Sequence, residues 1–325
     1  MATYSPLSRF EMNSNIPKLK KILNLLGRFL TIAALGLLFL KLKDHFHEVS
    51  NFPNPLRVVV FIFIFSVCWL ISSVTGAIAW RKLLRALGVN MSLKDTYVIM
   101  GLSQIGKYIP GNIFQYVGRA KIGGAYGITT DASIISMGME TMIAIITAMI
   151  VFVSGWNIMN PALYDTGIFS FLLSAKVWIL GGGVLIVGFL LIFFSGKVRE
   201  LFLKYKPYLK ARPIIVAALA DLVFFFAVGI IIAGMRYTIL PDGPNLSWNQ
   251  FASGFAISWI LGFIVPGAPG GIGIREVVFV SLFGPQIGDG IAVSLALLLR
   301  IITTLSDLWN FLIAFILNKT GKNFS

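Results

Sequence analysis

Eight ionisable side chains lie within or beside strongly apolar stretches of this 325-residue sequence. A charge near the centre of a bilayer costs several kcal/mol, so each of these residues is a candidate for a functional site. Cations in such places can bind phosphate, and carboxylates can pair with the cations or carry protons. The eight are Lys107, Arg119, Glu140, Asp221, Arg275, Glu276, Arg300 and Asp307.

Arg275 directly follows the glycine-rich stretch "PGAPGGIG", where a helix is expected to begin. Free N–H groups at a helix N-terminus, together with the two-pronged guanidinium, favour phosphate. We therefore predict that Arg275 and its neighbour Glu276 belong to a headgroup-binding site. The alternative is that Arg275 pairs with a carboxylate such as Glu140 and holds two parts of the chain together.

A second polar stretch, "GKYIPGNIFQYVGR", runs from residue 106 to residue 119. Lys107 precedes the Pro-Gly break and is expected to face a cavity. Arg119 either contributes to the same site or extends to the cytoplasmic face, as long cationic side chains do. The substrate-binding residues predicted from this stretch are Lys107, Tyr108, Asn112, Gln115 and Arg119.

The last predicted span carries Arg300 and Asp307 one heptad apart on one face, which favours a structural salt network. Glu140 and Asp307 are the candidate proton carriers, whereas Asp221 is expected to meet an interfacial lysine near the cytoplasmic end of its helix. The sequence contains no metalloprotease, nucleophile-elbow or Asp-x-Asp motif. We therefore predict no catalytic residue, no metal site and no cofactor, and expect a transporter and not an enzyme.

The composition indicates an all-α integral membrane protein. Hydrophobic residues make up 57% and charged residues 12% of the chain, whereas soluble domains carry roughly 25% charged residues. Apolar runs long enough to cross a ~30 Å hydrocarbon core predict six spans, near 25–42, 56–80, 131–154, 173–195, 213–235 and 290–316. The formal charge of +14 indicates basic cytoplasmic loops and anionic headgroups, and no nucleic acid.

Two further stretches, about 95–126 and 248–286, are apolar on either side of a Pro-Gly break. Proline and glycine interrupt helices, so both stretches are predicted to enter the membrane, turn and return. An alternative is that 248–264 is a complete span. The residues assigned to the breaks are Pro110, Gly111, Pro266, Gly267, Gly270, Gly271 and Gly273.

The two broken stretches resemble each other. Pro110-Gly111 precedes Arg119 by the same spacing as Pro266-Gly267 precedes Arg275, and "DASIIS" after the first parallels "DGIAVS" after the second. Three predicted spans separate the stretches, which would place them on opposite membrane faces. The sequence therefore predicts an inverted repeat, with units at about 95–154 and 248–316, as in many transporters.

The distribution of Lys and Arg places both termini in the cytoplasm. We predict a basic tail at 1–24, one membrane domain at 25–316 and a second tail at 317–325. The first span is expected to remain uncleaved, because no small-residue cleavage site follows it. The first outside loop, with Lys41, Lys43 and Arg57, fits the rule least well. The single cysteine, Cys68, is expected to pack in a span.

The two broken motifs resemble those of the transmembrane, flippase-like region of lysylphosphatidylglycerol synthase. Over about residues 20–316, the strongest marks are Tyr108, Pro110, Gly111 and Arg119 in the first motif, and Pro266, Gly267, Gly270, Gly271, Gly273, Arg275 and Glu276 in the second. The resemblance implies a prokaryotic inner membrane and movement of aminoacylated phospholipids between leaflets. Since this sequence ends at Ser325, the soluble synthase domain and its activity are not expected.

The partners implied are membrane phospholipids with anionic headgroups, a separate lipid-modifying synthase or glycosyltransferase, and further copies of the chain in a homo-oligomer. Some relatives are linked to polyprenyl-phosphate sugar pathways, so the lipid cargo stays open. The alternative functions are a membrane enzyme or an accessory subunit of lipid glycosylation or aminoacylation.

Overall fold

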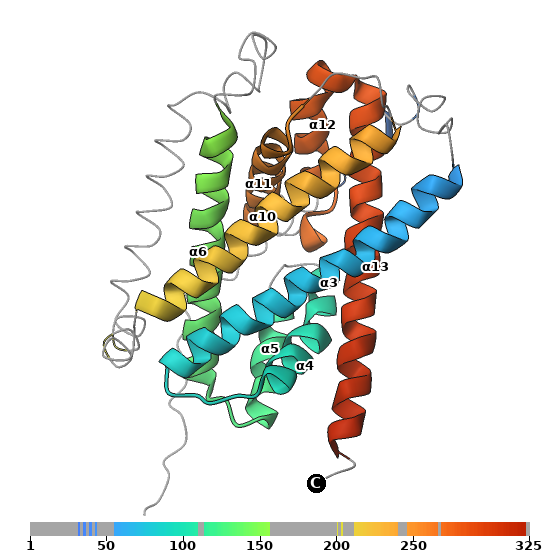
Figure 1. Cartoon of the computed structure of the whole chain (residues 1–325). Coiled ribbons are helices and arrows are strands. Elements are labelled where there is room, and N and C mark those ends of the chain that lie inside the picture. The colour runs from blue at the N-terminus through green and yellow to red at the C-terminus, as the bar shows by residue number, and fades with distance from the viewer. Residues whose placement is uncertain are drawn as a thin grey trace, which may run out of the picture.

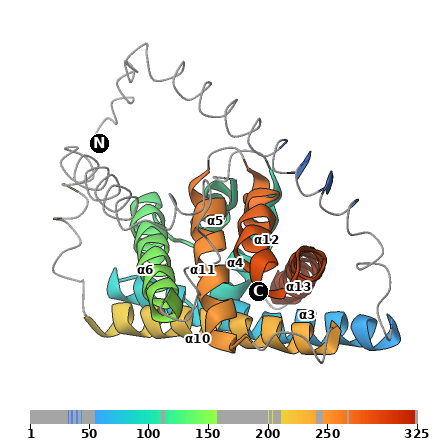
Figure 2. The ribbon, with the colours of Figure 1, turned by 90° about the horizontal axis from the view of Figure 1, so that it is seen from above.

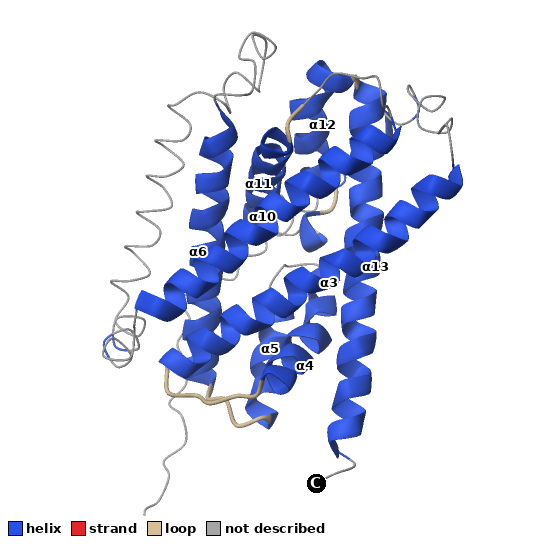
Figure 3. Ribbon diagram, viewed as in Figure 1, coloured by secondary structure: helices blue, strands red, loops and turns tan. Residues whose placement is uncertain are grey.

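The computed structural model of the chain describes residues 55–109, 114–156, 211–239, 246–265 and 268–322, with isolated positions within 32–43 and at 200 and 203. Every element in these ranges is helical (Figure 3). The α-helices are α3 (Pro55–Ala86), α4 (Leu93–Gln104), α5 (Phe114–Ala125), α6 (Thr130–Trp156), α10 (Ala211–Ile239), α11 (Trp248–Ile264), α12 (Ile274–Ile287) and α13 (Asp289–Lys322). Two 3-10 turns, η1 (Ile105–Tyr108) and η4 (Pro269–Gly271), lie at the breaks.

In the described ranges, four helices are long and apolar enough to cross a membrane: α3, α6, α10 and α13. Their spans, Leu56–Ala86, Thr130–Gly155, Ala211–Thr238 and Asp289–Lys319, confirm four of the six predicted spans. The span in α3 is longer than predicted, because the helix continues through the basic "WRKLLRA" stretch. The predicted spans at 173–195 and, apart from isolated helical positions, 25–42 lie outside the described residues. The chain is a multi-pass, all-helical membrane protein.

The helices around the breaks are shorter. The α4 and α5 helices have 12 residues each, α11 has 17 and α12 has 14. At ~1.5 Å per residue, they measure roughly 18 to 25 Å. Serine side chains begin the first helix of each pair, since Ser92 accepts a hydrogen bond from the N–H of Asp95 and Ser247 from that of Gln250.

The two short pairs lie in opposite halves of the molecule (Figure 1). The α4–α5 pair occupies the lower half of that view and the α11–α12 pair the upper half, and each lies between α6 and α13. Viewed from above, α3 and α10 form a layer across one side of the other helices (Figure 2). The η1 and η4 turns contact each other, so the two breaks meet inside the bundle.

The helix contacts follow the same pattern in two quartets, α3–α6 and α10–α13. The α4 helix packs on α13 of the other quartet, and α11 packs correspondingly on α6. Likewise, α3 contacts α13 as α10 contacts α6, and α5 contacts α6 as α12 contacts α13. The two quartets therefore share one pattern of helix contacts.

Small residues allow the crossed contacts to be close, as is common between membrane helices. A Cβ added at Gly101 of α4 would lie 2.7 Å from the Cβ of Ala314 and 2.9 Å from the Asn310 carbonyl oxygen on α13. One added at Gly155 of α6 would lie 2.3 Å from the Cβ of Ser253 on α11. Close packing therefore fixes both short pairs against the long helices.

Candidate functional site

A cavity of about 290 Å³ lies where the two breaks meet, near the lower end of the ~300–1,000 Å³ typical of ligand pockets. Both quartets contribute to its wall, and so do aromatic side chains such as Trp69, Phe224 and Trp259. Among the described residues, its ionisable acids and bases are four cations and three carboxylates. They are Lys107, Arg119, Arg275, Arg300, Glu140, Asp221 and Asp307.

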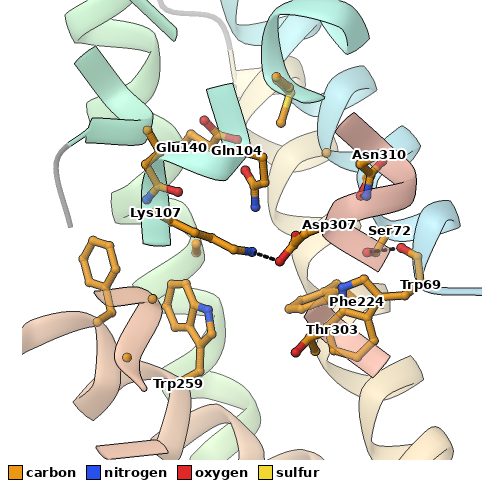
Figure 4. Close-up of a pocket in the computed structure, with 18 of the residues that line it drawn as sticks. Trp69, Ser72, Gln104, Lys107, Glu140, Phe224, Trp259, Thr303, Asp307 and Asn310 are labelled. Carbon is orange, nitrogen blue, oxygen red and sulfur yellow. Dashed lines mark hydrogen bonds and ion pairs between the residues drawn. The ribbon is translucent and has the colours of Figure 1, made fainter. Parts of the chain in front are cut away.

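The first break is held against α13 by Asp307. The Nζ atom of Lys107 lies 2.6 Å from Asp307 Oδ2, and the Tyr108 hydroxyl donates to the same oxygen at 2.5 Å. Figure 4 shows the Lys107 side chain directed toward Asp307, with Trp259 and Phe224 below this pair in that view. Lys107 therefore faces the cavity, as expected, but its ammonium group is already paired with a carboxylate from the last span.

The second break depends on glycine. Gly270, Gly271 and Gly273 have φ angles of 57°, 71° and 84°, a left-handed region that residues with a Cβ rarely adopt. The N–H of Gly273 donates to Glu276 Oε2 at 2.7 Å, which caps the start of α12. Because three left-handed glycines turn the chain within four residues, α12 begins directly at the cavity.

Arg300 ties this second break to α13. Its Nη1 atom donates to the Gly270 carbonyl at 3.4 Å, and its Nε atom lies 3.6 Å from Glu276 Oε1. Arg300 and Asp307 therefore both form ion pairs, but with different partners: Asp307 pairs with the first break and Arg300 with the second. Glu276 is buried and lies beside a small side pocket instead of on the wall of the main cavity.

Arg119 pairs with Glu140, joining α5 to α6. The arginine is only 6% exposed, and its guanidinium lies 5.0 Å from the centre of the Trp80 ring. The alternative that Arg119 extends to the cytoplasmic face is therefore wrong. The alternative pairing of Arg275 with Glu140 is also wrong, because Arg119 is the partner of that carboxylate.

Arg275 lies in a narrow slot between α11 and the η4 turn. A Cβ added at Gly262 would lie 2.4 Å from Arg275 Cγ, and one at Gly271 would lie 2.6 Å from its Nε. The guanidinium lies 5.9 Å from the centre of the Trp259 ring. Within the described part of the chain, Arg275 has no carboxylate at ion-pair distance, and its buried Nε has no hydrogen-bond partner.

Other predicted residues divide between the wall and the undescribed segments. Gln115 lines the cavity, and so does its neighbour Tyr116, whose hydroxyl lies 3.1 Å from Thr141 Oγ1. The predicted site and break residues that lie outside the described residues are Asn112, Pro110, Gly111, Pro266 and Gly267. Among the residues that the structure describes, no group of three or more His, Cys, Asp or Glu side chains is placed to hold a metal ion.

Sequence reasoning gave Asp221 the wrong neighbour and did not name Asn310. Asp221 of α10 lines the cavity and was instead expected to meet a lysine, but the charged group acting on it is Glu140. Asn310 donates to Ser73 Oγ at 2.7 Å and accepts from the Tyr97 hydroxyl at 2.7 Å. The sequence signal for Asn310 is that it is a polar residue on a predicted span, about one helical turn after Asp307.

The family comparison agrees with this geometry. The family described as the lysylphosphatidylglycerol synthase TM region matches residues 25–308, and no other domain is found. No curated protein matches the chain. This family is a membrane domain linked to lipid modification or flipping. Since the match covers most of the 325 residues, the chain belongs to the family of the lysylphosphatidylglycerol synthase TM region.

Proposed function

We propose that this protein is a flippase-like transporter that moves a phosphate-containing lipid, or lipid-linked headgroup, between leaflets. Aminoacylated phospholipids fall within this class. The observation that carries the proposal is Arg275, a cavity-wall cation without a carboxylate partner in the described chain. The other three cations on the wall, Lys107, Arg119 and Arg300, each have one.

The surroundings of Arg275 suit a phosphate. Arginine presents paired N–H donors that match two phosphate oxygens, and the guanidinium retains its charge in nearly all environments. Arg275 is the second residue of α12, so the partial positive charge of the helix N-terminus adds to its own. A bound phosphate would supply the anionic partner that the described chain does not.

The size of the cavity favours a headgroup over a whole lipid. Its volume of about 290 Å³ leaves the acyl chains in the surrounding bilayer. The four short helices are roughly 18 to 25 Å long, less than a ~30 Å hydrocarbon core. We therefore propose that both pairs are re-entrant from opposite faces and that alternating opening carries the headgroup across.

The remaining elements of the proposal follow from this role. The protein acts without group transfer, in the cytoplasmic membrane of a prokaryote, with both termini cytoplasmic. A separate lipid-modifying synthase or glycosyltransferase supplies or uses the lipid, and the chain can self-associate. The excess of basic residues supports contact with anionic headgroups.

The test is lipid movement in proteoliposomes that contain the purified chain. Fluorescent anionic, zwitterionic and aminoacylated phospholipids are compared for the wild type, Arg275→Gln and the control Arg85→Gln. Arg85 is an exposed cation in the last turn of α3, away from the cavity wall. We expect movement by the wild type and the control, and an approximately 10- to 100-fold loss in Arg275→Gln, since a charge-assisted hydrogen bond contributes about 1.5–3 kcal/mol.

Equal movement by Arg275→Gln and the wild type would refute the proposed phosphate site. If the wild type moves none of the lipids, with or without a proton gradient, the transporter proposal fails. Transfer of a sugar or aminoacyl group by the purified chain would then favour the enzyme. Co-purification of a synthase would instead favour the accessory subunit.

A further inference from the structure

Asp221 is a cavity carboxylate that the proposed phosphate site does not use. It lies on α10, and Ala220 and Phe224 on the same face also line the cavity. The side chain is partly buried. In the described part of the chain, it has neither an ion pair nor a hydrogen bond.

The other two cavity carboxylates are occupied. Glu140 pairs with Arg119, and Asp307 pairs with Lys107 while accepting from Tyr108. Sequence analysis suggests both as proton carriers, but each carboxylate balances a neighbouring cation. A cation that lost its partner would stay uncompensated inside the protein, which is strongly unfavourable.

The titratable neighbours of Asp221 come from several elements. The helices packed on α10 are α3, α6, α11 and α13. On the cavity wall, α6 contributes Glu140 and α13 contributes Arg300 and Asp307, whereas the wall residues of α3 and α11 are uncharged. Farther along the wall lie Tyr97 of α4, Lys107 and Tyr108 of η1, Tyr116 and Arg119 of α5, and Arg275 of α12.

These side chains form two groups of opposite charge. Arg275 interacts electrostatically with Arg300, Glu276, Asp307 and Tyr108, and Lys107 belongs to the same group. That group has three cations and two carboxylates. Asp221 interacts with Glu140, which is paired with Arg119. This second group has one cation and two carboxylates, so it holds an excess negative charge.

We infer that Asp221 takes up the proton that accompanies an anionic lipid headgroup through the cavity. The inference rests on the proposed function. A phosphate at Arg275 brings a negative charge into a confined space whose wall already holds the carboxylates of Asp221 and Glu140, and like charges repel strongly at low dielectric. A proton on Asp221 removes one of those charges, so headgroup and proton cross together without net charge.

The experiment combines two measurements on the full-length protein in liposomes. The first follows the infrared carboxyl band when short-chain phosphatidylglycerol is added. The second measures the movement of fluorescent phosphatidylglycerol as a function of pH, with a pH-sensitive dye trapped inside. Both compare the wild type with Asp221→Asn, and with Asp95→Asn as the matched control. Asp95 lies in the first turn of α4 beside Ser92 and outside the cavity wall.

In the wild type and in Asp95→Asn, lipid addition should produce a protonated-carboxyl band, and movement should accelerate as pH falls. The acceleration should reach at most about tenfold per pH unit, the limit for one titrating group. Asp221→Asn should lack the band and should move lipid at a rate that does not vary with pH. Proton entry should accompany lipid movement only when Asp221 is present.

The outcomes separate the two proposals. Lipid movement that retains its pH dependence and the carboxyl band in Asp221→Asn would overturn the role of Asp221 and leave the transporter intact. A lipid-dependent band that vanishes in Asp221→Asn, without lipid movement in any variant, would support protonation of Asp221 and overturn transport. Absence of both signals in the wild type would overturn both.

Discussion

The position of Arg275 depends on two neighbouring glycines, which have no Cβ. Gly262 on α11 and Gly271 in the η4 turn leave a slot through which the aliphatic part of the arginine passes. Trp259 lies under the guanidinium, an arrangement that stabilises a cation by about 0.5–2 kcal/mol. The slot therefore positions the guanidinium without an ion pair to any residue that the structure describes, which leaves its charge available to a ligand.

We predict that Gly262→Ala weakens the binding of anionic lipid. The added Cβ would lie 2.4 Å from Arg275 Cγ, so the arginine must leave its slot. Losing one charge-assisted hydrogen bond of about 1.5–3 kcal/mol would lower the apparent affinity roughly 10- to 100-fold. Titration of spin-labelled phosphatidylglycerol against the purified protein would measure this loss.

The control for that substitution is Gly124→Ala on α5, where an added Cβ has no atom within 4 Å. This variant should bind lipid as the wild type does. If Gly262→Ala also retains wild-type affinity while remaining folded, Arg275 does not need its slot and the account of its positioning is wrong.

Sequence reasoning identified most charged residues of the cavity wall but not which of them form ion pairs with each other. Lys107 could be placed because it precedes a helix break, where a cation needs a polar environment. The choice of Arg119 as the partner of Glu140 could not be predicted, because it depends on how α5 packs on α6. Asp221 was misjudged for the same reason, since its environment comes from the neighbouring helices.

Among the elements, α13 connects the two breaks. Asp307 binds the first break and Arg300 the second. Seven residues separate them, about two helical turns or roughly 10 Å along the axis. If either break moves relative to α13, the contacts of Asp307 or of Arg300 must rearrange. The α13 helix therefore couples the positions of the two breaks.

We predict that Lys107 and Asp307 are energetically coupled. Asp307→Asn leaves the lysine uncompensated and should lower the free energy of unfolding by about 3–5 kcal/mol. Adding Lys107→Met should recover much of that loss, because no unpaired charge remains. Denaturant unfolding of both single variants and the double variant, in detergent, would measure the coupling energy.

If the two single changes add within about 0.5 kcal/mol, as for independent sites, the ion pair does not hold the first break. Tyr108→Phe offers a milder comparison, since it removes only the hydroxyl that donates to Asp307. Its cost should be about 1 kcal/mol, the net contribution of a typical hydrogen bond, or up to about 3 for a charged acceptor.

The element boundaries were easier to predict than their packing. The four confirmed spans are long apolar runs, whose length alone indicates a crossing. Glycines marked the second break, where Gly270, Gly271 and Gly273 interrupt the helix by their local conformation. The crossed contacts of α4 with α13 and of α11 with α6 involve segments far apart in the chain, which no local pattern encodes.

For the whole molecule, the corresponding contacts of the two quartets converge on one cavity. Each quartet brings a broken pair and a long helix to that place (Figure 1). The first quartet supplies the ion pair of Arg119 with Glu140 on the wall, and in the second the wall residue Arg300 pairs with Glu276 beside the side pocket.

Blocking the cavity with a bulky group tests whether the lipid headgroup passes through it. Thr303 of α13 lines the cavity, while Ile301 of the same helix is 46% exposed on the outer surface. Thr303→Cys and Ile301→Cys would be prepared with Cys68→Ser, which removes the native, exposed cysteine. Phospholipid movement would be measured in proteoliposomes before and after complete modification of the cysteine with a bulky maleimide.

We predict that both variants move phospholipid before modification. Modification at position 303 should then reduce movement at least tenfold, whereas modification at 301 should leave the rate unchanged. Wild-type movement by protein fully modified at 303 would contradict the account, because the headgroup could not then pass through this cavity.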